Sequence, residues 1–200
     1  MNFTCEIDLC QKCMKLDFSN RLNSVRKPFV NFQVEEIWKP VQVKVLFVAE
    51  SPPWNGNQAY FYNQNSHNKR TNLRIEVLKL LNLNSLIEFK NRGYYLIDAI
   101  KCRLNKREKK KVPTEVVLIC SDQFLQKEIK QLKPEKIVIL GNTAKKALQR
   151  IPEFTELTHH KVTENYETIL SGYEIILTVY PGGQTRKYQD KIKKAFLKLG

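Results

Sequence analysis

The chain has 200 residues, of which 42% are hydrophobic, and its formal net charge is +14. This length predicts a single domain over residues 1–200, and we expect a monomer. No apolar run approaches the roughly 20 residues that span a bilayer, and the opening MNFTCEIDLC lacks the basic and apolar segments of a signal peptide. These features predict a cytoplasmic protein without a membrane partner.

The first half of the chain predicts two strands and a helix. Residues 1–25 are polar, and an apolar-aromatic segment follows at residues 29–42. Val43–Ala49 is short, continuous and rich in β-branched residues, which is typical of a buried parallel strand. Apolar residues at helical spacing predict a helix over Leu73–Leu81, and Gly93–Ile100 predicts the second strand.

The second half alternates helices and strands. We predict helices over Thr114–Leu132, Ala144–Arg150 and Lys187–Leu199, and strands over Lys136–Leu140 and Glu174–Val179. Strands that alternate with helices predict a three-layer α/β/α fold around a mostly parallel, four-stranded sheet.

Ligands of such sheets bind beyond the carboxyl ends of the strands. Four segments of the chain meet at this edge: Glu50–Trp54, Asp98–Cys102, Gly141–Thr143 and Tyr180–Arg186. These segments are therefore where we expect a functional site.

Four of the five cysteines form two pairs. Cys10 and Cys13 are spaced as C-x2-C, and seventeen residues separate Cys102 from Cys120. An odd number of cysteines in a cytoplasmic chain argues against a disulfide framework, and Cys5 is the spare thiol. Four thiolates suit either an iron–sulfur cluster or zinc, and such a site ties the N-terminal segment 1–25 to a distant loop.

The excess of positive charge favours a polyanionic partner, and nucleic acid before an acidic membrane surface. A dense basic stretch, KCRLNKREKKK, lies between Cys102 and Cys120. Its residues Arg103, Lys106 and Arg107 are candidates for phosphate contacts, which make binding depend steeply on salt. A solvated basic loop is the alternative.

Four stretches carry a resemblance to a known family. VLFVAESPP, YLIDAIKCR, CSDQFLQKEIKQLKPEKIVILGNTAKKAL and LTVYPGGQTRK resemble, in order, the motifs of the iron–sulfur (family-four) branch of the uracil-DNA glycosylase superfamily. The resemblance covers nearly the whole chain. It implies DNA, single- or double-stranded, as partner, base excision as activity, and a 4Fe-4S cluster held by Cys10, Cys13, Cys102 and Cys120, with zinc as the less favoured occupant.

Several motif positions depart from that branch. Its uracil-reading Asn is Asp98 here, its His is Tyr180, and the Ser that follows that His is Gly182. Glu50, Phe61 and Arg186 match directly, and Tyr60 and Tyr62 are the alternatives to Phe61 if the register shifts by one residue. The resemblance therefore implies the superfamily and the cluster more specifically than it implies excision of uracil.

Glu50 is the candidate catalytic carboxylate. Breaking an N-glycosidic bond builds positive charge on the sugar, and a carboxylate orients water and stabilises that cation. The resemblance places Phe61 as the ring that stacks on an extruded base. Ser51, which departs from the family loop, is a further candidate for substrate binding. Free N–H groups at Asn142 could hold a phosphate. Core packing of Phe61 and a loop role for Glu50 are the alternatives.

Asp98 changes what the pocket can recognise. An Asn amide pairs with both N3–H and O4 of uracil, whereas an ionised carboxylate only accepts hydrogen bonds. The substrate is then an altered base other than uracil. Alternatively, Asp98 is protonated in a dry pocket and mimics Asn, or the pocket no longer reads a base.

Tyr180 replaces an imidazole by a neutral phenol, which is a weaker partner for a departing anionic base. Gln184 and Tyr188 are the alternative candidates to fill the gap left by a flipped base, and Arg186 is the candidate to anchor a phosphate. The leading hypothesis is a DNA glycosylase for a damaged base. The alternatives are an inactive iron–sulfur nucleic-acid-binding protein on the same scaffold, and an enzyme for a free or RNA-linked base.

Overall fold

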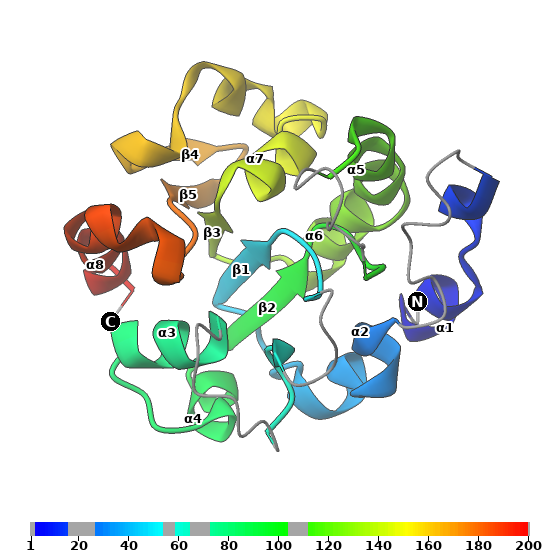
Figure 1. The fold of residues 1–200 in the computed structure, drawn as a ribbon, viewed down its shortest axis with the longest axis horizontal. Coiled ribbons are helices and arrows are strands. Elements are labelled where there is room, and N and C mark those ends of the chain that lie inside the picture. The colour runs from blue at the N-terminus through cyan, green and yellow to red at the C-terminus, as the bar shows by residue number, and fades with distance from the viewer. Residues whose placement is uncertain (1–2, 16–26, 54–58, 65–72, 104–111, 200) are drawn as a thin grey trace.

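The structure, a computed structural model, describes residues 3–15, 27–53, 59–64, 73–103 and 112–199. A five-stranded sheet lies at its centre, in the order β2-β1-β3-β5-β4 (Figure 1). The strands are β1 Val45–Ala49, β2 Tyr94–Asp98, β3 Lys136–Leu140, β4 Tyr166–Leu170 and β5 Tyr173–Thr178.

The sheet is mostly parallel. β1 pairs with β2 and β3, and β3 pairs with β5, all in parallel, while β4 runs antiparallel to β5 at the edge. The predicted α/β class is confirmed, but the expected count of four strands is wrong because β4 was not predicted. In β4, half-buried and exposed residues alternate before the buried Leu170, so the strand lacks the continuous apolar run that marks its neighbours.

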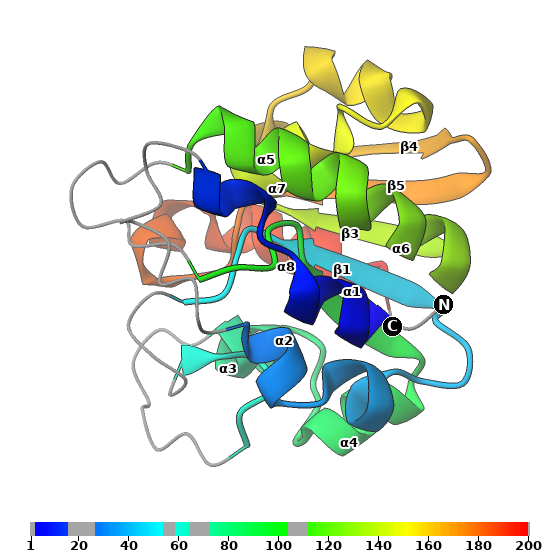
Figure 2. The same ribbon diagram turned by 90° about the vertical axis from the view of Figure 1, so that its right-hand side faces the viewer.

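Helices cover both faces of the sheet. Figure 2 shows α5, α6 and α7 on one face, and α3, α4 and α8 group on the other side in Figure 1. Helix α7 packs on β1 and β3, α8 on β5, and α4 on β2. Their bounds are α3 Leu73–Leu80, α4 Leu86–Asn91, α5 Thr114–Cys120, α6 Gln126–Leu132, α7 Asn142–Leu148 and α8 Gln189–Leu197.

Shorter helical segments complete the described chain. The N-terminal ones are α1 Phe3–Leu9, η1 Lys12–Lys15, α2 Pro28–Asn31 and the π-helix η3 Val34–Trp38. The later ones are the 3-10 helices η6 Pro152–His159, η7 Val162–Glu164 and η8 Gly183–Tyr188. Among the described residues, no helix is both long and apolar enough to cross a bilayer.

The predicted helix over Thr114–Leu132 is present over its full length, with one irregularity. A π-helical segment, η5 Ser121–Leu125, separates α5 from α6 and begins directly after Cys120. π-Segments are rare and gather at functional sites because they re-aim the side chains that flank them. Helix α4, in contrast, was not predicted; its N-cap Ser85 accepts a 3.1 Å hydrogen bond from the Glu88 N–H.

The core lies between the central strands and these helices. Every residue of β1 and β2 is buried, and the Phe47 ring contacts the rings of Phe89, Tyr94 and Phe196. Strands covered on both faces expose polar groups only where they end. The functional groups of this sheet therefore gather at its carboxyl edge.

Candidate active site

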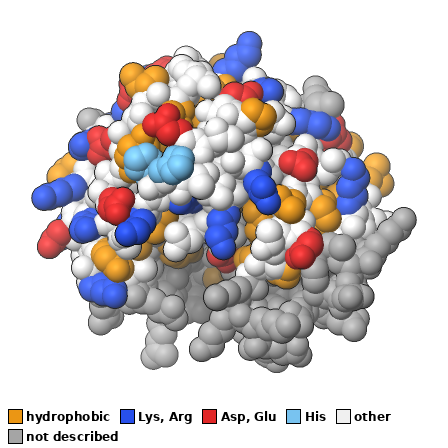
Figure 3. All heavy atoms as spheres, turned by 90° about the horizontal axis from the view of Figure 1, so that it is seen from above, with side chains coloured by type: hydrophobic (Ala, Val, Ile, Leu, Met, Phe, Trp, Pro, Cys, Tyr) orange, Lys and Arg blue, Asp and Glu red, His pale blue; other side chains and the backbone are white. Residues whose placement is uncertain are grey.

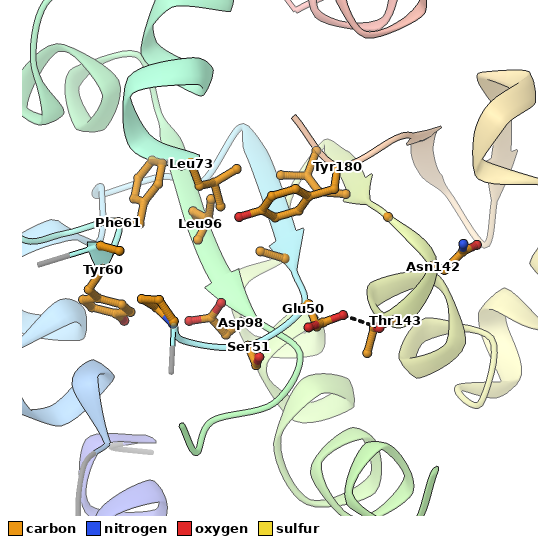
Figure 4. A pocket seen from close by; sticks show the side chains of 15 residues that line it. Glu50, Ser51, Tyr60, Phe61, Leu73, Leu96, Asp98, Asn142, Thr143 and Tyr180 are labelled. Atoms are coloured by element: carbon orange, nitrogen blue, oxygen red, sulfur yellow. Dashed lines mark hydrogen bonds between the residues drawn. The ribbon is translucent and has the colours of Figure 1, made fainter. Parts of the chain in front are cut away.

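A cavity of about 350 Å³ opens at the carboxyl ends of β1, β2 and β3 and beside the loop after β5. Its lining, most of it labelled in Figure 4, is Ala49, Glu50, Ser51, Pro53, Ala59, Tyr60, Phe61, Leu73, Leu96, Asp98, Leu140, Gly141, Asn142, Thr143 and Tyr180. The chain continues from β1 to β2 on one side and returns to β3 on the other, so the cavity lies at a topological switch point.

Glu50 follows the last residue of β1 and faces the cavity. Its carboxylate accepts a 2.5 Å hydrogen bond from the Thr143 hydroxyl, drawn as a dashed line in Figure 4. Its backbone carbonyl accepts a 3.0 Å bond from the Ile100 N–H. Both ends of the residue are thus held, one by α7 and one by the segment after β2.

Asp98 is the last residue of β2. In the parallel register it pairs with Ala49, which directly precedes Glu50 in the chain. Only 9% of Asp98 is exposed. Burial raises the pKa of its carboxyl from 3.8 to about 7, although the positive charge of Lys101 opposes this shift. Near neutral pH, a large share of Asp98 therefore carries a proton and can donate a hydrogen bond as well as accept one.

Lys101 and Glu128 form a buried ion pair behind the cavity. Lys101 Nζ lies 2.6 Å from Glu128 Oε2, and each side chain is 2% exposed. The same ammonium donates a 2.7 Å hydrogen bond to the backbone carbonyl of Asp98. Burial raises the pKa of Glu128, while the Lys101 charge lowers it.

Tyr180 closes the opposite wall, and its hydroxyl points into the cavity toward Leu96 (Figure 4). Gly141 has φ +88°, and a Cβ there would lie 3.2 Å from Tyr180 Cβ. A glycine is therefore required for this close approach. Burial, and next the charge of Asp98, raise the pKa of the phenol. Tyr180 is a neutral donor at physiological pH.

Phe61 lines the cavity but is 3% exposed. Its ring lies 5.0 Å from Tyr62 and 5.3 Å from Phe89, both edge-on. The neighbouring Tyr60 lines the same wall and packs 5.2 Å from Phe32. Both rings are anchored in the core, so stacking on a ligand requires no further ordering of their side chains.

Ser51 and Asn142 lie at different depths. Among the described residues, the Ser51 hydroxyl is shielded from solvent and has no hydrogen-bond partner, which leaves it available to a ligand. Asn142 borders the cavity at the start of α7, and its amide points away from Glu50 (Figure 4). Asn142 is thus a rim residue.

The four paired cysteines come together beside this site. The Cys120 thiol donates a hydrogen bond to Cys13, which lowers the pKa of Cys13 and raises that of Cys120. Cys102 interacts electrostatically with Cys10 and Cys120, and burial raises its pKa to about 12. All five cysteines are free thiols. The pairs that the sequence separates are thus neighbours in space.

The arrangement of these thiols is not that of a site for one ion. Within the described ranges, no three or more His, Cys, Asp or Glu side chains are placed to hold a single metal ion. An iron–sulfur cube has another requirement, because each thiolate binds a different iron and the four ligands surround the cube. Zinc would require the four sulfur atoms to move toward one point.

Of the basic residues predicted to contact phosphate, only Arg103 has a described side chain. Arg103 is fully buried, which contradicts the predicted phosphate contact, because a phosphate cannot reach a side chain enclosed by the core. Its charge acts instead on the buried Tyr60, whose pKa it lowers against the larger effect of burial. Lys106 and Arg107 lie outside the described residues. Gln184 and Arg186 belong to η8, and their side chains lie outside the described part.

Figure 3 shows the face at the top of Figure 1. On it, Lys and Arg side chains are dispersed, with acidic and apolar groups between them. His159 and His160 do not line the cavity; His160 stacks on Tyr166 with a centroid distance of 3.3 Å. The described residues of this face therefore form no concentrated basic patch, and the two histidines are not part of the candidate site.

Fold and cavity together define an α/β protein with a candidate ligand site at the carboxyl edge of a mostly parallel sheet. Residues 37–199 match the family model of the Uracil DNA glycosylase superfamily, and the chain belongs to this superfamily. None of the curated proteins matches the chain. The predicted superfamily is confirmed, and the iron–sulfur branch within it stays a prediction.

Sequence reasoning brought Glu50, Ser51, Phe61, Asp98, Asn142 and Tyr180 to one site, and all six line the cavity. It missed the partners that hold them. Thr143 was placed at the carboxyl edge of the sheet without a role, and nothing indicated that Lys101 and Glu128 form a pair. The one available signal for the Thr143–Glu50 contact was strand order. Glu50 follows β1 and Thr143 comes shortly after β3, and these two strands pair.

Proposed function

We propose that this protein is a DNA glycosylase that hydrolyses the N-glycosidic bond of a damaged base. One observation carries the proposal: a superfamily cavity in which the Glu50 carboxylate, the raised-pKa Asp98 carboxyl and the Tyr180 hydroxyl face the same space. A flipped base needs an enclosed apolar slot with a few polar groups at its edge. Leu73, Leu96 and the aromatic wall supply the apolar part.

Glu50 acts on the sugar side. As the bond to the base breaks, positive charge grows on the sugar, and the ionised carboxylate stabilises it and orients the attacking water. The Thr143 hydroxyl donates to one carboxylate oxygen of Glu50 and so fixes the orientation of the group. Tyr180 donates a hydrogen bond to the departing base.

Asp98 and Ser51 read the base. A protonated Asp98 offers a donor and an acceptor side by side, as an Asn amide does, whereas the ionised form suits a base edge with two donors. Because the pKa of Asp98 is about 7, both forms are present near neutral pH. The pocket therefore suits a deaminated or otherwise altered base, including one with purine-like donors.

The four cysteines hold a 4Fe-4S cluster in this proposal. The two pairs are in reach of one another, and four thiolates without other ligands are the donor set that such clusters use. The cluster holds the N-terminal segment and the Cys102 loop against α5. Zinc is the alternative occupant. Protein purified without oxygen is expected to be brown, with absorption at about 400 nm. A colourless preparation that contains zinc contradicts the proposed iron–sulfur cluster.

The activity is tested with metal-loaded protein and oligonucleotides that carry uracil, hypoxanthine, xanthine, oxidised or alkylated bases, single-stranded and paired. Glu50→Gln is expected to lower abasic-site formation by roughly 10²–10⁴-fold. Glu135→Gln is the matched control, because Glu135 is exposed at the opposite end of the sheet, before β3. Unchanged excision in Glu50→Gln refutes the catalytic role.

An inactive nucleic-acid-binding protein is the second candidate. Tyr180 favours it, since a phenol whose pKa is raised stays neutral and stabilises an anionic base less than an imidazolium does. Retained strand binding without excision of any base in the panel supports this candidate. Excision from RNA or from free nucleosides alone supports an enzyme for those substrates.

A further inference from the structure

The Lys101–Glu128 ion pair lies between the cysteines and the cavity. Burying two charges costs several kcal/mol per ion before their attraction offsets it, and an apolar pair of similar volume is often at least as stable. Fold stability alone therefore does not explain a pair whose side chains are each 2% exposed. Its contacts on either side suggest a role in positioning.

One side of the pair faces the cysteines. Lys101 directly precedes Cys102, and its backbone N–H donates to the sulfur of Cys120. Glu128 lies on α6, which continues the helix of Cys120 through the π-segment η5. The ion pair thus joins the two chain segments that carry the second cysteine pair.

The other side faces the cavity. The Lys101 ammonium holds the carbonyl of Asp98 at 2.7 Å. The two residues after Asp98 hold this segment against the end of β1. Ala99 N–H donates to the Ala49 carbonyl at 2.8 Å, and Ile100 N–H donates to the Glu50 carbonyl at 3.0 Å. The ammonium and these two amide hydrogen bonds together hold the segment that places both cavity carboxylates.

We propose that Lys101 and Glu128 are positioning residues that couple occupancy of the four-cysteine site to the placement of Asp98 and Glu50. The proposal rests on the proposed function for the meaning of the cavity and of the metal site. A bound metal group fixes Cys102 and Cys120 relative to each other. The ion pair then holds the segment between Asp98 and Cys102 in one conformation; without the group, this segment loosens.

Hydrogen exchange at the amides of Ala99 and Ile100 reports this coupling without substrate. The full-length, metal-loaded protein is compared with the same protein after a chelator has removed the metal, with iron and zinc measured before and after. In the native sequence, removal is expected to speed exchange of both amides by roughly tenfold or more. Amides that keep their protection after metal loss overturn the proposal, as does protein that never holds metal at these thiols.

The variant Lys101→Met/Glu128→Met replaces the pair by apolar groups of similar length. It is expected to keep its metal and to show fast exchange at both amides already in the loaded state, with little further change on removal. The matched control is Lys130→Met/Glu153→Met, which removes an ion pair of 3.0 Å from the partly exposed surface and is expected to respond as the native sequence does. A double variant that responds like this control overturns the proposal.

If the double variant does not fold, Glu128→Gln replaces it in the exchange experiment. This variant keeps the shape of the side chain and an acceptor for Lys101. Intermediate exchange at Ala99 and Ile100 in this loaded variant supports the coupling, and native-like exchange opposes it. Hydrogen exchange is measured without substrate, so the coupling can be detected even if the protein binds DNA and excises no base. Failure of the proposed activity and failure of the coupling are thus distinguishable.

Discussion

Replacing Asp98 by Asn tests the electrostatics of the cavity directly. The pKa of Asp98 is raised from 3.8 to about 7 in the folded protein, so the folded state binds this proton more tightly than the unfolded state. The free energy of unfolding therefore falls as the pH rises between these two values. Each pH unit in this window costs about 1.4 kcal/mol, which gives a loss of about 2 kcal/mol between about pH 5 and pH 7.

The side-chain amide introduced by Asp98→Asn does not titrate, so this part of the pH dependence is absent from the variant. The difference in unfolding free energy between the variant and the native sequence is expected to shift by about 2 kcal/mol in favour of the variant from about pH 5 to pH 7. Burial also raises the pKa of Glu128, and its contribution largely cancels because both proteins contain it.

The measurement is urea unfolding of the metal-loaded protein at several pH values, with the metal content held equal. Asp190→Asn, at an exposed position of α8, controls for the loss of one negative charge. A difference between Asp98→Asn and the native sequence that does not change with pH refutes the reasoning, because it means that Asp98 ionises in the fold as easily as in water.

Three further variants test single contacts. Thr143→Val removes the 2.5 Å hydrogen bond to Glu50 and is expected to lower kcat of excision roughly tenfold with KM little changed; a change in KM alone argues against orientation of the carboxylate. Gly141→Ala places a Cβ 3.2 Å from that of Tyr180 at φ +88°, and we expect a loss of about 1–3 kcal/mol in chemical unfolding, which an unchanged midpoint contradicts. Cys120→Ala removes a predicted ligand and is expected to abolish absorption at about 400 nm; a variant that keeps the native absorption shows that Cys120 binds no iron.

Exchange of Asp98 for Asn also tests base recognition. The variant restores an amide that pairs with N3–H and O4 of uracil at every pH, so uracil excision is expected to appear or to strengthen. Parallel assays of the native sequence and the variant on uracil and hypoxanthine strands measure the change in preference. If the ratio of the two rates stays the same, Asp98 does not determine which base is read.

Local sequence determined the central strands and most of the helices. β3 lies where the continuous run Lys136–Leu140 predicted it, and the strand over Gly93–Ile100 forms as Tyr94–Asp98. Buried parallel strands need apolar side chains on both faces, which leaves a signal within a few residues. The same locality explains why the strand-end residues Glu50 and Asp98 were found, since parallel strands end at a common edge.

The tertiary structure decided what those residues experience. The desolvation that raises the pKa of Asp98, the enclosure of Arg103, and the pairing of Lys101 with Glu128 depend on which segments pack together. A basic residue in a basic stretch carries no local signal of burial, so the enclosure of Arg103 depends on tertiary packing. Residue types and strand ends are thus properties of the sequence, whereas burial, partners and proton affinity arise from contacts between residues far apart in it.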